Sequence, residues 1–175
     1  MVSANELKQQ DELICKLQDY LEKIIVPENS QDQARLFSLL RIMVYLKVLR
    51  SDLENLEYAL NIRTQPAIYQ IALDFIQIVE NEGNIRLGLS SSDDLQQLYV
   101  ELENLKQWSK QHHAELREKI NSYASTYQLN AVKTLELLAA HRWLERLISH
   151  SLRLVNVLKE RQQSLTVAEA DDEHV

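Results

Sequence analysis

Histidine and glutamate side chains that could bind a metal ion lie in the second half of the chain. His112 and His141 fall on the apolar stripes of two expected helices, and Glu145 follows His141 by four residues, on the same helical face. Imidazole nitrogens and carboxylate oxygens are ligands for transition metals, so these three residues are the candidate metal ligands. His113 adjoins His112, but neighbouring residues on a helix point apart, so this pair cannot chelate an ion as a unit. A hydrogen-bonded structural histidine pair is the preferred interpretation, and no bound metal is expected.

The spacing of the two histidines predicts that they are neighbours. A short turn near residues 126 and 127 separates two helical segments, which should therefore run antiparallel. His112 lies about 14 residues before the turn and His141 about 14 after it, so both stand roughly 21 Å from it at about 1.5 Å per residue. We therefore expect the imidazoles of His112 and His141 to meet in or beside the core, with ring centres within about 12 Å.

Other chemical signatures are missing from the sequence. It contains no glycine-rich phosphate loop, no nucleophile elbow and no zinc-finger spacing, and Cys15 is the only cysteine. A formal net charge of −7 argues against binding to nucleic acid, which requires a basic surface. These features indicate a protein that is not an enzyme and has no nucleic-acid partner.

The composition predicts an all-α fold. Only two Gly and two Pro occur among 175 residues, and good helix formers dominate. Apolar residues at three-and-four spacing predict a bundle of five long helices. They are expected at about 3–25, 31–62, 66–87, from 92 to a break at 122–128, and 130–163. We expect one domain over 1–165, made of a hairpin (3–62) and a three-helix unit (66–163), followed by a disordered acidic tail at 166–175.

Two parts of the chain resemble each other. Residues 45–52, "YLKVLRSD", align with 143–150, "WLERLISH", so that an aromatic residue, two leucines and a serine recur at the same spacing. The alignment predicts that 31–62 superposes on 129–160. If each repeat unit has three helices, the first helix of the first unit is missing.

Residues 134–158, "TLELLAAHRWLERLISHSLRLVNVL", resemble the last helix of PhoU-like proteins. The family pattern is roughly Leu-x-x-Ala-Arg-Tyr-Leu-Glu-Arg-Ile-Gly-Asp-His-Ala-x-Asn-Ile, which Arg142, Leu144, Glu145, Arg146 and His150 match. The resemblance implies paired three-helix bundles related by a repeat, as the internal similarity suggests. Family members attend phosphate transport, some as free regulators and others as the cytosolic tail of sodium/phosphate symporters.

The resemblance also indicates where this chain departs from the family. Family members hold clustered metal ions, such as iron, zinc or magnesium, on carboxylates spaced four apart on one helical face. Here those positions are Glu145, Ser149 and Arg153 in the second repeat and Lys47, Ser51 and Asn55 in the first. Each triplet carries at most one carboxylate, and each also carries one cationic side chain that would repel a metal ion. We therefore expect no metal cluster at either place.

The resemblance implies a non-catalytic cytosolic regulatory module of phosphate transport, the soluble tail of a sodium/phosphate symporter, that works through protein contacts. The expected partner is a membrane phosphate transporter or a transmembrane domain of the same chain, at the inner face of the membrane, and a homodimer is an alternative. No run of the sequence approaches the roughly 20 apolar residues of a membrane span. The other interpretations are a free-standing regulator and a structural oligomerising bundle without a link to phosphate. The expected interaction face comprises Arg142, Glu145, Arg146, Ser149, Lys47, Ser51 and Asn55.

Overall fold

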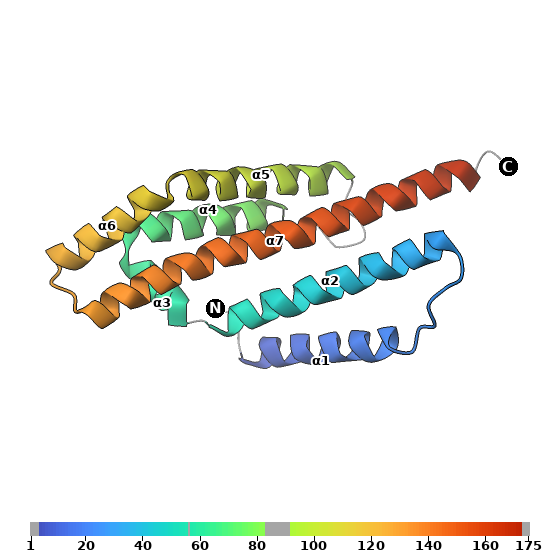
Figure 1. Cartoon of the computed structure of the whole chain (residues 1–175), viewed down its shortest axis with the longest axis horizontal. Helices are drawn as coiled ribbons and strands as arrows, with labels where there is room; N and C mark the ends of the chain where they lie inside the picture. The colour runs from blue at the N-terminus through green and yellow to red at the C-terminus, as the bar shows by residue number, and fades with distance from the viewer. Residues whose placement is uncertain (1–3, 56, 83–91, 173–175) are drawn as a thin grey trace.

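The computed structural model describes residues 4–55, 57–82 and 92–172, and all of the regular structure in them is helical (Figure 1). The all-α prediction is confirmed, but these residues form seven helices where five were expected. They are α1 (Ala4–Leu21), α2 (Ser30–Glu54), α3 (Glu57–Thr64), α4 (Pro66–Glu82), α5 (Ser92–Gln111), α6 (His113–Thr126) and α7 (Ala131–Asp172).

The long helix α7 organises the bundle. It has 42 residues and packs against each of α2 to α6. Helix α2 runs antiparallel along one side of α7, and α5 and α6 follow one another along another side (Figure 1). Helix α1 contacts only α2 among the described helices. The N-terminal hairpin is therefore joined to the rest of the molecule mainly through the contact between α2 and α7.

The first additional break separates α2 from α3. Asn55 caps α2 with φ −86° and ψ 50°, which are not helical values, and its side-chain amide donates to the carbonyl of Ser51. Asparagine side chains compete in this way with the backbone hydrogen bonds of a helix. The apolar stripe of 31–62 continues across the break, which is why the periodicity predicted a single helix.

The second additional break separates α5 from α6 at His112. Its φ of −96° and ψ of 9° lie outside the helical range. The carbonyl of Trp108 accepts from the backbone N–H of His112 at 3.0 Å and from its ring Nδ1 at 2.8 Å. The side chain thus turns back onto its own helix, and the new helix begins at His113.

The main core lies where α4, α5 and α6 meet α7. Its fully buried members include Ile68 and Ile71 from α4, Ile120 from α6 and Ile148 from α7. Burying each such side chain stabilises the fold by about 1.5–3 kcal/mol. The start of α4 is fixed by Gln65, whose buried side chain accepts from the backbone N–H of Ile68 at 2.9 Å.

The expected repeat and tail differ from the structure in two respects. The stretch 31–62 bends at Asn55, whereas 131–160 lies within the unbroken helix α7, so the repeat is not confirmed. Helix α7 also continues to Asp172, through most of the segment 166–175 that we expected to be disordered. Extending an existing helix adds one hydrogen bond per residue without a new nucleus, and Val167–Ala170 contain no helix breaker. Residues 173–175 lie outside the described residues.

The buried carboxylate of Asp52 joins α2 to α7. Its Oδ1 accepts from Nε of Arg146 at 2.8 Å, and its Oδ2 accepts from Nδ1 of His150 at 2.6 Å. The indole of Trp143 donates to the backbone carbonyl of Asp52 at 2.8 Å. We call Asp52, Trp143, Arg146 and His150 the Asp52 network. Its three donors all come from α7, so one residue of α2 accepts three hydrogen bonds from the long helix.

We predict that Asp52→Ala destabilises the protein by about 2–4 kcal/mol, because two charge-assisted hydrogen bonds are lost and the partly buried ring of His150 is left without an acceptor. Chemical denaturation followed by circular dichroism measures the change.

Glu115→Gln is the matched control, since it removes a carboxylate from a solvent-exposed pair with Lys119 within α6. Such pairs contribute little. Equal midpoints for Asp52→Ala and Glu115→Gln would show that the Asp52 network does not hold the hairpin.

Candidate functional site

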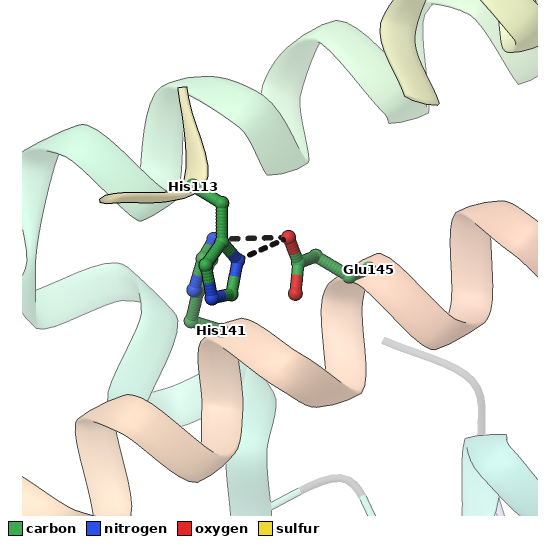
Figure 2. Close-up of side chains that lie close together, drawn as sticks. All are labelled: His113, His141 and Glu145. Atoms are coloured by element: carbon green, nitrogen blue, oxygen red, sulfur yellow. Dashed lines mark hydrogen bonds and ion pairs between the residues drawn. The ribbon is translucent and has the colours of Figure 1, made fainter. Parts of the chain in front are cut away.

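His113, His141 and Glu145 converge between α6 and α7 (Figure 2). We call these residues the His–Glu cluster. Nδ1 of His113 lies 2.9 Å from Oε1 of Glu145, and Nε2 of His141 lies 3.8 Å from the same oxygen. The two imidazole rings are stacked with centroids 5.4 Å apart. One nitrogen or oxygen atom from each residue lies within 4.8 Å of the other two, which is the arrangement of a potential metal site.

Local structure explains why these side chains meet. His141 and Glu145 are four residues apart on α7 and therefore share one face of the helix. His113 is the first residue of α6, directly after the break at His112, and it points toward that face of α7 (Figure 2). The cluster thus depends on the antiparallel packing of α6 on α7.

Burial controls the protonation of His141. Only 1% of its side chain is exposed, and this burial is the largest cause that lowers its pKa below the usual value. The carboxylate of Glu145 acts in the opposite direction. The neighbouring His113, and then Arg142 and Arg117, lower the pKa further. At neutral pH the His141 imidazole is therefore uncharged, which is the form that can bind a metal ion.

A surface pocket of about 440 Å³ opens beside the His–Glu cluster. His113 and Glu145 line it on one side, and Lys106, Lys110 and Ser149 are among its other lining residues. The buried hydroxyl of Ser109, also in the pocket lining, donates to Oε1 of Glu145 at 3.3 Å. The cluster is therefore accessible from solvent on the side of His113 and Glu145, whereas His141 closes it from within.

The predicted neighbour of His141 was His112, one residue away from the ring that stacks on it. The ring that stacks on His141 belongs to His113, whereas His112 stacks on Trp108 with ring centroids 4.4 Å apart. The helix break at His112 shifts the inward-facing positions, so the residue after it faces α7. The predicted position of the histidine contact along the two helices therefore agrees with the structure to within one residue. Of the three predicted candidate ligands, Glu145 and His141 belong to the His–Glu cluster.

The residues of the expected interaction face on α7 have different environments. Arg142 is exposed, and Arg146 binds the carboxylate of Asp52. Glu145 belongs to the His–Glu cluster, and Ser149 lines the adjacent pocket. Glu145 and Arg146 thus make contacts to other helices of the same chain.

The residues of that expected face on α2 also differ among themselves. Lys47 is exposed and its ammonium contacts the side-chain oxygen of Gln18 on α1. Ser51 is exposed, and Asn55 ends α2. The carboxylate that binds α7 comes instead from Asp52, and the one feature of the sequence that pointed to it is its alignment with His150 in the proposed repeat.

Comparisons with protein-family models, with curated proteins and with solved structures found no match to this chain. Within the described ranges, no helix is both long and apolar enough to cross a membrane. The resemblance to PhoU-like proteins therefore stays an inference from the residues of α7.

We predict that His141 makes the metal-free protein less stable as the pH falls. Because its pKa is lower in the folded than in the unfolded state, the unfolded chain binds more protons, so the free energy of unfolding decreases as the pH falls through and below about 6.5. Denaturation in the presence of a chelator at pH 7.5, 6.5 and 5.5 measures this decrease.

His141→Gln should lose part of this dependence of the free energy of unfolding on pH. His112→Gln removes a ring that stacks on Trp108, outside the His–Glu cluster, and should keep the pH dependence of the parent. A full parental slope in His141→Gln would contradict the prediction.

Proposed function

We propose that this chain is a non-catalytic regulatory module of phosphate transport, similar to PhoU-like proteins. It acts by contact with a membrane phosphate transporter, or with a transmembrane domain to which it belongs. The observation that carries the proposal is the position of the PhoU-like run 134–158 on α7, the helix against which α2 to α6 all pack.

The PhoU-like residues support a scaffold rather than a catalytic centre. Arg146 and His150 bind Asp52, and Glu145 binds His113, so the polar residues of the run connect α7 to α2 and α6. Arg142 remains exposed on the same helix and is available to a partner. A run with these contacts keeps the relative positions of the helices fixed, as a docking module requires.

Exposed apolar side chains support action through protein contacts. Tyr69, Leu73, Ile76 and Val79 follow one another at three-and-four spacing on α4, and each is between 38% and 46% exposed. Contiguous apolar side chains on a soluble surface mark sites of protein contact. The same stripe also favours the alternative of an oligomerising bundle, which light scattering on the purified chain would distinguish by its mass.

We predict that Ile76→Glu weakens regulation of phosphate uptake while the fold is preserved, because a charge in the apolar stripe of α4 opposes burial against a partner. The measurement is the rate of radiolabelled phosphate uptake in the source cell after deletion of the coding region and after complementation. Parent protein should restore the original rate, and the Ile76→Glu variant should leave it close to that of the deletion.

Gln77→Glu is the matched control, because it adds the same charge to the neighbouring exposed position of α4, to one side of the stripe. Sulfate uptake tests specificity for phosphate. If deletion leaves phosphate uptake unchanged, the proposed function is wrong; if Ile76→Glu complements fully, the α4 stripe does not contact the transporter.

A further inference from the structure

We propose that the His–Glu cluster is a mononuclear site for a divalent transition metal of the zinc class, with His113, His141 and Glu145 as its three protein ligands and one coordination position open to the adjacent pocket. The site is separate from the two triplets to which the family resemblance points, at Glu145/Ser149/Arg153 and Lys47/Ser51/Asn55, and shares only Glu145 with them.

The distances between the ligand atoms fit a metal ion. Bonds of about 2.0–2.2 Å to zinc place two ligand atoms of a tetrahedron roughly 3.4 Å apart. The distances from Oε1 of Glu145 are 2.9 Å to Nδ1 of His113 and 3.8 Å to Nε2 of His141, on either side of this value. One ligand atom from each of the three residues lies within 4.8 Å of the other two. A small inward movement of the imidazole rings would bring these atoms to bonding distance of a shared ion.

A second observation is independent of these distances. Nε2 of His141 is buried and has no hydrogen-bond partner in the part of the chain that the structure describes. A buried polar nitrogen without a partner costs about 1–3 kcal/mol, so native proteins rarely keep one. This nitrogen faces the carboxylate of Glu145 at a distance that is too long for a hydrogen bond, and a metal ion between the two atoms would satisfy both.

The surroundings hold the ligands in place. His141 and Glu145 project from consecutive turns of α7, and the buried hydroxyl of Ser109 donates to the carboxylate of Glu145. Hydrogen bonds of this kind orient metal ligands and raise affinity. The ion would therefore bind to a largely formed site.

The donor atoms select the class of metal. Two imidazoles and one carboxylate disfavour magnesium and calcium, which prefer oxygen ligands, and suit zinc, cobalt or ferrous iron. Three protein ligands with an open position are typical of zinc sites that bind an exogenous ligand. Lys106 and Lys110 line the same pocket, so an anionic fourth ligand is favoured there.

Metal titration of the purified chain, stripped with a chelator and without an affinity tag, tests the proposal. We expect one equivalent of zinc with a dissociation constant of about 1 μM or below. We also expect cobalt to give the visible absorption of a four- or five-coordinate ion, which zinc then displaces. Zinc should raise the thermal midpoint of unfolding in a concentration-dependent manner, because it binds the folded state.

The variants separate a specific site from general binding to histidines. His113→Ala and the isosteric Glu145→Gln should each weaken zinc binding at least about tenfold, whereas His112→Ala should stay within about twofold of the parent. His112 and His113 are adjacent in sequence, so this comparison changes only which imidazole is lost. Circular dichroism in chelator checks that each variant is folded.

Three results would overturn the proposal: zinc binding weaker than about 100 μM in the parent, equal effects of His112→Ala and His113→Ala, or unchanged affinity in Glu145→Gln. In each case the cluster would be a hydrogen-bonded pair of His113 and Glu145 beside a buried imidazole. The test uses the purified chain alone, so its result is independent of the proposed role in phosphate transport.

Discussion

The buried carboxylate of Asp52 is the contact on which the arrangement of the molecule depends. Helix α1 packs only on α2 among the described helices, and α2 is fixed to the bundle where Asp52 meets Arg146, His150 and Trp143 of α7. A buried carboxylate requires such donors, because an unpaired charge in a core is costly. Residues 53 and beyond then turn at Asn55 into α3, which also packs on α7, so the position of the hairpin and the course of the following chain are set together.

Helix α7 carries two polar clusters on different faces. His141 and Glu145 face α6, whereas Arg146 and His150 face α2. At about 100° per residue, the second pair lies roughly 140° around the helix from the first. The longer way round the helix between the two pairs is apolar and buried, with Leu144 and Ile148 in the main core, whereas the shorter arc carries the exposed Arg142. One helix therefore positions both clusters, and each connects α7 to a different part of the chain.

Periodicity in the sequence predicted the helical class, the starts of five of the seven described helices and the level at which the two histidine-bearing helices meet. It could not predict the breaks at Asn55 and His112, because the apolar stripe continues through both. Positions 112 and 113 stand four and three residues before Leu116, and both spacings fit a helical stripe. In the structure the ring of His112 contacts the carbonyl of Trp108, which leaves His113 as the histidine that faces α7. The sequence does not reveal this contact. Asp52 was missed for a related reason: a carboxylate between apolar positions reads as a solvated residue until its donors on α7 are placed opposite it.

The helix break at His112 has a consequence for the candidate metal site. Because of the break, His113 is the first residue of α6, and its contact with Glu145 joins the start of α6 directly to α7. A metal ion at the His–Glu cluster would replace a single hydrogen bond by three coordinate bonds at this junction. It would hold α6 and α7 together at the point where the α5–α6 segment is interrupted. Loss of the ion would leave the main core intact, since Leu116 and Ile120 pack on α7 regardless, and would change only how firmly the junction is held.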